Sequence, residues 1–190
     1  MSRPLFLFVG PSGCGKTTVT ELLEAKRGEK SIRSYTTRSP RYSGEDGHVF
    51  ISEDEFDKLE DLVAYTVYNG IRYGTTIEQV DNSTLYVIDI PGIETLIKNY
   101  KDTKRKICIF YFDSTVATRI KRMIERGDSD TAIVGRLLND EEYNWYHKLD
   151  QLVWHYKYNE KRNVELYKIN ANEDIENVFE RVLYHIRINN

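Results

Sequence analysis

A glycine-rich segment near the N-terminus limits the possible folds of this chain more than any other stretch. Its residues are Gly10, Pro11, Ser12, Gly13, Cys14, Gly15, Lys16 and Thr17. They match the phosphate-binding pattern G-x-x-x-x-G-K-[ST], and the apolar run 5–9 and the helix-like segment 18–27 supply the flanking strand and helix that the pattern requires. The alternative, a chance glycine turn, accounts for neither flanking element. We therefore predict a P-loop between the first strand and the first helix.

The residue types in this loop suit the binding of ATP. Glycines let the backbone curl until successive N–H groups point inward at a helix N-terminus, where the helix dipole also favours an anion. We expect Lys16 to reach the β- and γ-phosphates. We expect the Thr17 hydroxyl to be a ligand of Mg²⁺, which prefers oxygen ligands and is usually held by few protein groups plus phosphates. The predicted ATP-binding residues of this segment are Gly10, Pro11, Ser12, Gly13, Cys14, Gly15, Lys16, Thr17 and Thr18.

The composition excludes several other classes of protein. A net charge of -3 with 30% charged residues gives no global attraction to nucleic acid or to an anionic membrane. No stretch has the length of a membrane span or the layout of a signal peptide. Cys14 and Cys108 suggest reduced thiols in a cytoplasmic protein. Cys14 is either a small side chain that fits the loop or a reactive thiol, and the chain is either a monomer or a homodimer.

Apolar runs alternate with helical patterns along the chain. Runs bounded by turn residues are typical of strands that are buried on both faces, and their alternation with helices predicts a parallel sheet with right-handed crossovers. The expected strands are 5–9, 85–90, 107–112 and 164–169, and the expected helices include 18–27, 93–100 and 175–188. The predicted fold class is therefore α/β, with a doubly wound parallel sheet in a single domain that covers residues 1–190.

Two polar segments interrupt the alternating pattern. The segment 34–83 is rich in Tyr, Arg, Gly and Thr, and the segment 118–154 is helical and highly charged. Long insertions in a compact domain usually form binding lobes or lids. We expect the first insertion to hold a phosphoryl acceptor and the second to close over the donor. The predicted core then consists of residues 1–33, 84–117 and 155–190.

The first insertion contains a candidate clamp for a phosphate monoester. Arg38 and Arg41 lie among hydroxyl side chains, and a Tyr73-Gly74-Thr75 turn follows later. Arginine binds phosphate oxygens with two parallel hydrogen bonds, and tyrosine hydroxyls add further donors. The alternative for such a cluster is a solvated surface rich in turns.

Several motifs together resemble guanylate kinases in their content and order. They are the P-loop, Ser34-Tyr35-Thr36-Thr37-Arg38-Ser39-Pro40-Arg41, Gly44-Glu45, Asp46-Gly47, the segment 50–56, Tyr73-Gly74-Thr75 and Arg126-Gly127. The resemblance extends from about Arg3 to Asn172. It implies a P-loop NTPase-type core with an inserted nucleoside-monophosphate lobe and a helical lid. It also implies a Mg²⁺-dependent kinase that transfers the γ-phosphoryl group of ATP to a monophosphate, in the first place GMP or dGMP.

The resemblance assigns roles to individual residues of the acceptor lobe. Arg38, Arg41 and Tyr73 match residues that grip the acceptor phosphate, and His48 stands where the family has a tyrosine that helps to hold it. Ser34 and Thr75 match residues near the base. All of these residues are expected to bind the acceptor.

The resemblance also assigns roles in the lid and the core. Arg122, Arg126 and Arg136 match arginines that approach the ATP phosphates, and they complete the expected catalytic set with Lys16; the alternative is an ordinary charged helix face. Asn172 matches a residue near adenine. Asp89 matches an aspartate at the end of a strand, and we expect it to assist Thr17 in binding Mg²⁺. An acid that caps the following helix is the alternative role for Asp89.

The departures from the family pattern fall on base recognition. Guanine presents N–H donors on its pairing edge, so a selective site needs acceptors there. Ala64 and Pro91 stand where the family has acids. A different acceptor, such as another or modified deoxynucleotide or a phosphorylated ribose, is therefore an alternative to GMP. A non-catalytic binding module and a P-loop ATPase with another task are further alternatives, although the intact Lys16 and Thr17 argue against the binding module.

Overall fold

The core of the protein is a parallel sheet. The computed structural model of the chain describes residues 3–41, 43–68, 70–141 and 144–190. The four strands lie in the order β6-β1-β7-β8, and all three pairings are parallel. Their bounds are β1 (Leu5–Val9), β6 (Leu85–Val87), β7 (Ile107–Asp113) and β8 (Val164–Asn170). The predicted α/β class is confirmed, and each expected buried run overlaps one of these strands.

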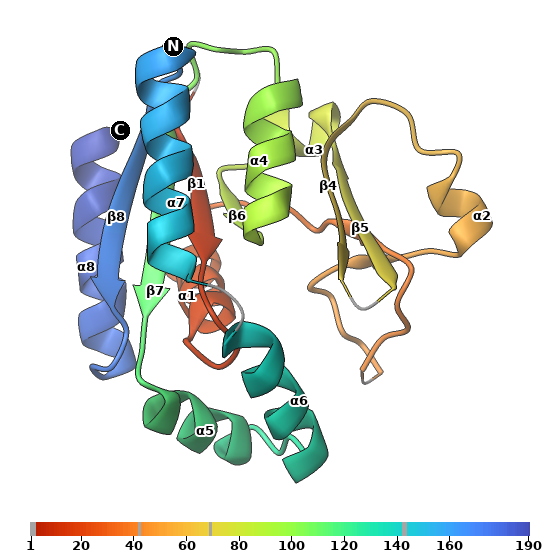
Figure 1. Ribbon diagram of the computed structural model, residues 1–190, viewed down its shortest axis with the longest axis vertical. Helices are drawn as coiled ribbons and strands as arrows, with labels where there is room; N and C mark the ends of the chain where they lie inside the picture. The colour runs from red at the N-terminus through yellow and green to blue at the C-terminus, as the bar shows by residue number, and fades with distance from the viewer. Residues whose placement is uncertain (1–2, 42, 69, 142–143) are drawn as a thin grey trace.

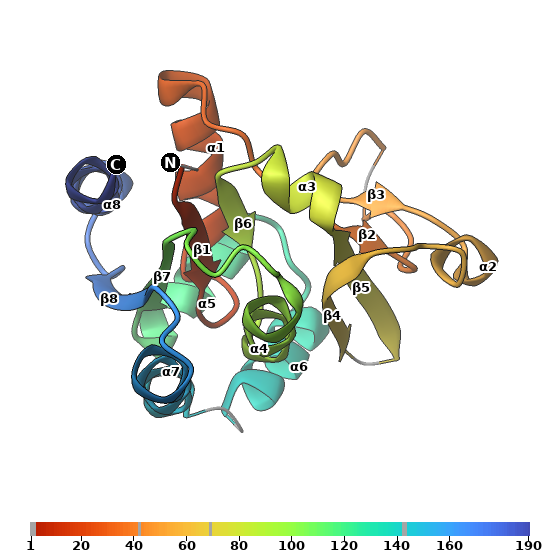
Figure 2. The same cartoon turned by 90° about the horizontal axis from the view of Figure 1, so that it is seen from above.

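Helices cover both faces of this sheet (Figures 1 and 2). Because successive side chains of a strand point to opposite faces, each strand contributes to two apolar clusters. Phe6 and Phe8 pack with α1 and α8 on one face, while Leu5 and Leu7 pack with α4 and α7 on the other. The bounds are α1 (Lys16–Arg27), α4 (Ile90–Asn99), α7 (Trp145–Trp154) and α8 (Ile175–Asn189).

The first insertion forms a separate lobe beside the sheet (Figures 1 and 2). Its strands form a mixed sheet in the order β3-β2-β5-β4. The lobe elements are β2 (Tyr35–Thr36), β3 (Val49–Phe50), α2 (Glu53–Phe56), β4 (Leu62–Tyr68), β5 (Ile71–Thr76) and α3 (Ile77–Asp81). Strand β5 was not predicted, because its Tyr73-Gly74-Thr75 stretch reads as a turn in isolation. In the structure it pairs along β4.

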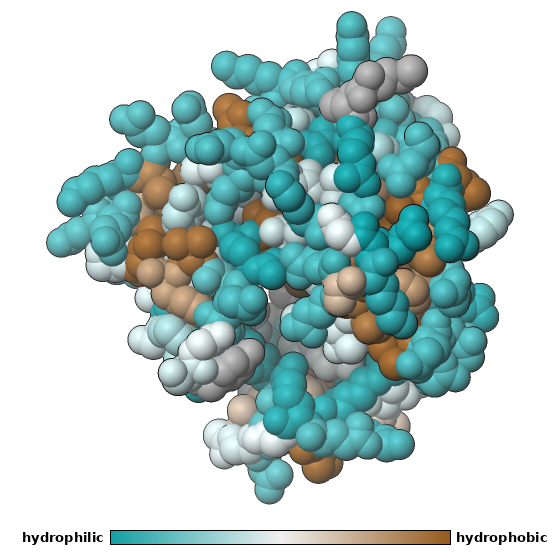
Figure 3. All heavy atoms as spheres, turned by 180° about the vertical axis from the view of Figure 1, so that it is seen from behind, coloured by the Kyte–Doolittle hydropathy of each residue, from teal (hydrophilic) through white to brown (hydrophobic). Residues whose placement is uncertain are grey.

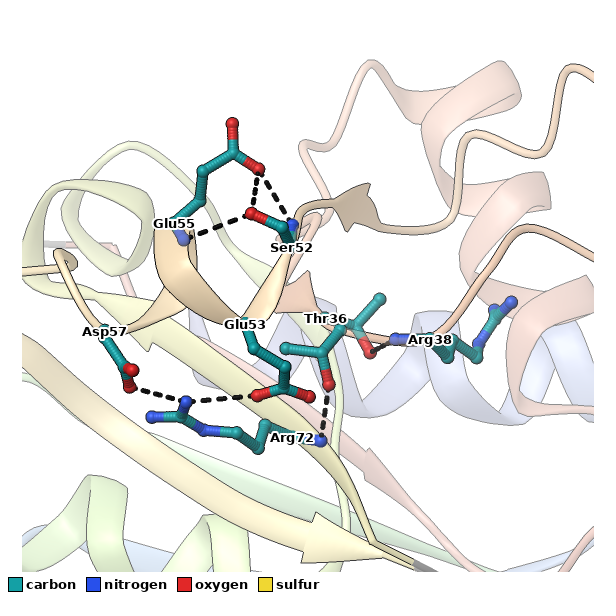
Figure 4. A network of polar contacts seen from close by, with 8 residues as sticks. Thr36, Arg38, Ser52, Glu53, Glu55, Asp57 and Arg72 are labelled. Carbon is teal, nitrogen blue, oxygen red and sulfur yellow. Dashed lines mark hydrogen bonds and ion pairs between the residues drawn. The ribbon is translucent and has the colours of Figure 1, made fainter.

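Polar contacts hold helix α2 against this lobe (Figure 4). Ser52 caps the helix and forms a reciprocal capping box with Glu55. Arg72 of β5 pairs with both Glu53 and Asp57. The turn after β3 is thereby tied to the second strand of the lobe hairpin.

The second insertion divides between the lid and the core. Helices α5 (Val116–Glu125) and α6 (Asp130–Glu141) lie beyond the carboxyl ends of the parallel strands (Figure 1). Helix α7 instead packs on the sheet, with Leu149 and Val153 buried in the same cluster as Leu7. The expected lid, 118–154, therefore includes a core helix, because α7 carries apolar residues on the face that meets the sheet. A π-helical turn, His155–Asn159, continues α7.

Strand β6 is shorter than expected, and this changes the position of Asp89. The strand ends at Val87, and Asp89 is the N-cap of α4. Its carboxylate accepts a hydrogen bond from the Gly92 N–H at 2.8 Å. Pro91 lies in the first turn of α4, where its missing N–H leaves no helical bond unmade. Asp89 therefore caps α4, which was the alternative role expected for it.

Hydrophilic side chains cover most of the face seen from behind, which is hollowed near its middle (Figure 3). Among the described residues, no helix combines the length and the apolar character that a membrane crossing requires.

Candidate active site

The P-loop has the backbone geometry that its glycines permit. Gly10, Gly13 and Gly15 have φ angles of 149°, 76° and 97°. A Cβ atom on Gly10 would lie 2.8 Å from the Phe112 carbonyl oxygen, and one on Gly13 would lie 2.8 Å from the Arg119 carbonyl oxygen. Both the backbone conformation and the close approach of neighbouring segments therefore require glycine at positions 10 and 13.

The last residues of the P-loop lie at the start of α1. Lys16 is the first residue of the helix, and its ammonium group donates hydrogen bonds to the carbonyl oxygens of Gly10 at 2.7 Å and Pro11 at 3.0 Å. Thr17 and Thr18 follow on the exposed side of the first turn. The buried Cys14 thiol packs in the apolar cluster with Phe6. Of the two alternatives for Cys14, this burial favours a small side chain that fits the loop over a reactive thiol.

A buried carboxylate of α6 joins this helix to the P-loop and to α5. The Asp140 carboxylate accepts hydrogen bonds from the Ser12 N–H at 2.9 Å and from Arg119 at 2.8 Å. The side chains of Arg119 and Asp140 are only 6% and 9% exposed. Neither residue was singled out from the sequence. The contact holds α6 against the loop, although the two segments are more than one hundred residues apart in the sequence.

The three predicted lid arginines have different surroundings. Arg122 lies against the P-loop and donates to the carbonyl oxygens of Cys14 at 3.2 Å and Glu173 at 3.0 Å. Arg126 is half exposed and pairs with Asp128. Arg136 also reaches the Asp128 carboxylate, at 3.5 Å.

A pocket of about 280 Å³ joins the P-loop, the lobe, the core and the lid. Its lining includes Gly10, Ser12, Lys16, Ser34, Arg41, His48, Tyr65, Thr66, Tyr68, Tyr73, Tyr86, Asp89, Arg136, Asn139, Asp140 and Trp145. Its cations come from all three parts, with Lys16 in the loop, Arg41 in the lobe and Arg136 in the lid. The lobe and the lid also touch directly, because Asn139 donates a hydrogen bond to the Tyr68 hydroxyl at 3.0 Å.

The two arginines of the predicted clamp differ in their partners. Arg38 forms a bidentate pair with Glu45, and both side chains are only 8% exposed. This pair lowers the pKa of Glu45 to about 2. The Glu45 carboxylate also accepts a hydrogen bond from the Arg41 N–H at 2.7 Å. Arg38 and Glu45 therefore form a support for the Arg41 segment, and Glu45 is a site residue that the sequence reasoning left without a role.

The Arg41 side chain reaches the pocket itself. Desolvation lowers the pKa of Arg41, and the positive charges of Arg38 and Arg136 lower it further. This repulsion means that the pocket brings several cations together. A bound anion between Arg41 and Arg136 would relieve it.

The part of the pocket nearest the lobe contains hydrogen-bonded side chains. His48 Nδ1 lies 2.9 Å from Ser34 Oγ. Burial, with a further contribution from Arg38, lowers the pKa of His48 to about 4, so the imidazole is neutral at neutral pH. Thr66 of β4 donates a hydrogen bond to Asp89 at 2.9 Å. Burial raises the pKa of Asp89.

Two of the predicted contact residues, Thr75 and Asn172, are bonded to other parts of the protein. Thr75 has no exposed surface, and its hydroxyl lies 2.6 Å from the Tyr86 hydroxyl, so Tyr86 rather than Thr75 lines the pocket. Ala64 is also buried and pairs with Thr75 across the lobe hairpin. Asn172 holds the start of α5, because its side-chain oxygen accepts a hydrogen bond from the Thr115 N–H at 2.8 Å. Tyr86 was missed because it stands inside an apolar run.

The expected Mg²⁺ partners fit the metal only in part. The Thr17 hydroxyl is an exposed oxygen donor next to Lys16, as a magnesium ion held mainly by ATP phosphates requires. Asp89 already accepts hydrogen bonds from Gly92 and Thr66 and faces the pocket beside the lobe. Among the described residues, no group of three or more His, Cys, Asp or Glu side chains could hold a metal ion by itself.

Comparison with known proteins identifies the family. The family model described as guanylate kinase matches residues 1–149. The chain belongs to the guanylate kinase family. The resemblance predicted from the ordered motifs is therefore confirmed.

Individual guanylate kinases are similar to this chain over most of their length. The protein of Schizosaccharomyces pombe is 32% identical over 150 residues, which cover 71% of this chain and 72% of that protein. The guanylate kinase of Trichodesmium erythraeum is 29% identical over 183 residues, or 80% of this chain and 97% of that protein. The crystal structure of guanylate kinase from Anaplasma phagocytophilum has a TM-score of 0.55 at 16% identity and covers 98% of this chain and 86% of that chain. This structural likeness supports the P-loop NTPase-type fold.

Proposed function

We propose that this protein is an ATP-dependent kinase that transfers the γ-phosphoryl group of ATP to GMP or dGMP. The observation that carries the proposal is the pocket described above. It is lined by the cations Lys16, Arg41 and Arg136, by the Asp89 carboxylate and by several hydroxyls. A nucleoside monophosphate needs both kinds of group, because it carries a dianionic phosphate and a hydrogen-bonding base.

The cationic part of the pocket suits the acceptor phosphate. Arg41 has a pKa lowered by desolvation and by its positive neighbours, and Arg136 approaches from the lid. Arginine forks match phosphate oxygens in geometry as well as charge. In this proposal Arg41 binds the acceptor phosphate directly, and Arg38 with Glu45 holds the Arg41 backbone in place.

The base part of the pocket suits guanine better than adenine. Guanine presents an O6 acceptor and N–H donors at N1 and N2, whereas adenine presents a donor at N6 and an acceptor at N1. The pocket offers the Asp89 carboxylate as an acceptor and the hydroxyls of Ser34 and Tyr86 as donors. Asp89 can thus replace the two acids that the family has at the positions of Ala64 and Pro91. We therefore assign Asp89 to base recognition rather than to magnesium.

The transfer step needs positioning and positive charge more than covalent chemistry. Phosphoryl transfer passes through a loose transition state with negative charge spread over the transferred group. Lys16 lies in the P-loop, and Arg122 contacts the loop from the lid, so both cations are near the phosphates of ATP in this proposal. Mg²⁺, held by ATP and Thr17, would supply further charge neutralisation. Arg126 and Arg136 share Asp128, which keeps both arginines on the same part of the lid.

Coupled measurement of ADP formation by the purified protein tests the proposal. The assay contains ATP, Mg²⁺ and one acceptor at a time, from GMP, dGMP, IMP, AMP, the pyrimidine monophosphates and ribose 5-phosphate. We expect GMP or dGMP to give the highest kcat/KM. Lys16→Ala serves as the inactive control. The proposal is wrong if another acceptor dominates, if no acceptor is used, or if ATP is hydrolysed equally fast without an acceptor.

The remaining expectations concern the setting of this enzyme. Both cysteines are free and buried, which agrees with a reducing compartment, and a cytoplasmic location stays a prediction. A monomer or a homodimer that binds neither nucleic acid nor membrane also stays a prediction.

A further inference from the structure

A buried tyrosine stands between the pocket and a threonine that was expected to contact the base. Thr75 has no exposed surface, while Tyr86 is 5% exposed and lines the pocket. Their hydroxyl oxygens are 2.6 Å apart. A ligand in the pocket would therefore meet the phenol of Tyr86 and not the hydroxyl of Thr75.

The hydrogen bond between these two hydroxyls has a preferred direction. A buried hydroxyl that leaves its proton without an acceptor costs about 1–3 kcal/mol. Within the described part of the chain, the Tyr86 oxygen is the hydrogen-bond partner of the Thr75 side chain. Both protons are used when Thr75 donates to Tyr86 and the phenol of Tyr86 turns its own proton toward the Ser34 hydroxyl, which also lines the pocket. Burial raises the pKa of Tyr86, so the phenol keeps this proton throughout the range in which the enzyme works.

Tyr86 and Ala64 belong to one apolar cluster, in which the core meets the lobe. Ala64 lies opposite Thr75 in the lobe hairpin and belongs to the same apolar cluster as Tyr86. Tyr86 itself comes from β6, next to the P-loop strand, where it pairs with Leu7. The phenol thus extends from the core sheet to Thr75 of the lobe.

We propose that Tyr86 determines the base specificity of the acceptor pocket by donating a hydrogen bond to the 6-oxo group of a purine, with Thr75 behind it as the positioning residue. This inference rests on the proposed function and names the group that reads one edge of the base. Asp89 accepts from the other edge. The 6-oxopurine monophosphates GMP and IMP share the group that Tyr86 reads, whereas AMP presents an N–H donor at the same place.

Tyr86→Phe tests the inference, because it removes one oxygen and keeps the ring. We measure kcat and KM for GMP, IMP, AMP and ATP, together with the melting temperature. A neutral hydrogen bond contributes about 0.5–1.5 kcal/mol, so the KM for GMP and for IMP should rise about 2- to 12-fold. The KM for ATP should stay unchanged, and the preference for GMP over AMP should fall by a similar factor.

Two further variants separate specificity from a structural role. Tyr100→Phe is the matched control, because the Tyr100 hydroxyl donates to Asp81 at 2.6 Å in a part of the core away from the pocket. It should change the melting temperature and leave all KM values unchanged. Thr75→Val should raise the KM for GMP. The double variant Thr75→Val/Tyr86→Phe should have the same KM for GMP as Tyr86→Phe alone, since both substitutions disrupt the same hydrogen-bonded pair.

The outcomes distinguish this inference from the proposed function. If the wild-type protein phosphorylates GMP but Tyr86→Phe keeps the same ratio of GMP to AMP activity, the specificity role of Tyr86 is wrong while the kinase assignment stands. An equal loss for every acceptor would likewise show that Tyr86 only joins the lobe to the core. If the wild-type protein has no kinase activity, calorimetric titration with GMP and AMP gives the same comparison by binding. A wild-type protein that binds neither nucleotide contradicts both proposals.

Discussion

Replacement of Arg41 by alanine should separate acceptor binding from stability. The Arg41 guanidinium reaches the pocket, and the described residues place no carboxylate of the protein within ion-pair distance of it. Only its backbone N–H is held, by Glu45, and alanine keeps that hydrogen bond. The variant therefore loses a side chain that the folded protein hardly uses for its own stability.

The size of the effect follows from the type of hydrogen bond. A hydrogen bond from a charged donor to a charged acceptor contributes about 1.5–3 kcal/mol. Because 1.36 kcal/mol corresponds to a factor of ten, the KM for GMP should rise about 12- to 160-fold in Arg41→Ala. The KM for ATP should change far less. The variant also removes the repulsion among Arg41, Arg38 and Arg136, so the free energy of unfolding should stay within about 0.5 kcal/mol of the wild type or increase.

Arg72→Ala is the matched control in the same lobe. Arg72 pairs with Glu53 and Asp57 and lies over the Phe56 ring at 4.3 Å, outside the pocket. This variant should lower the melting temperature and leave the KM for GMP unchanged. Steady-state kinetics and thermal unfolding of both variants give the comparison. An unchanged KM for GMP in Arg41→Ala would refute the clamp, and a marked loss of stability in that variant would show that Arg41 is a structural residue.

Three other predictions follow from the site. Lys16→Ala should lower kcat at least about 100-fold with an unchanged circular dichroism spectrum, since it removes a preorganised cation from the transferred charge; retained turnover would exclude the P-loop as the donor site. Asp140→Ala leaves the buried Arg119 charge without its partner, which costs about 3–5 kcal/mol, so the melting temperature should fall by about 6–20 °C, and a shift of under 2 °C would contradict the role of this pair. The free energy of unfolding should also fall on acidification from about pH 6.5 to pH 4. In this range His48 binds a proton in the unfolded chain, whereas in the folded protein its pKa of about 4 keeps it neutral. The depressed pKa of Glu45, about 2, extends this loss to lower pH, and His48→Gln should flatten the upper part of the unfolding curve against pH.

The sequence predicted those parts of the protein whose chemistry is local. Glycine spacing identifies the P-loop, because the backbone there must adopt positive φ angles, which a side chain disfavours. The buried strands were predicted because each is a continuous apolar run. The two predictions that depended on a single isolated stretch were less accurate. Strand β5 was missed because its glycine is typical of a turn. Helix α7 was assigned to the lid because the many polar residues of the segment made the apolar face with Leu149 and Val153 hard to recognise in the sequence.

The roles of individual site residues depended on partners far away in the chain. The sequence shows Arg38 and Arg41 as equivalent, yet only the fold determines that Glu45 pairs with Arg38 and leaves Arg41 to the pocket. Likewise, no local pattern places Asp140 against the Ser12 N–H.

By itself, the sequence determined that this chain is a P-loop protein of the α/β class with two polar insertions, because these features are encoded in the spacing and periodicity of neighbouring residues. Only the tertiary structure decided that Tyr86 rather than Thr75 lines the pocket beside the P-loop and that Asp89 faces this pocket. The physical reason is that burial and hydrogen-bond direction arise between side chains of different elements. A residue's exposure to the ligand is therefore a property of its surroundings, which a linear pattern does not contain.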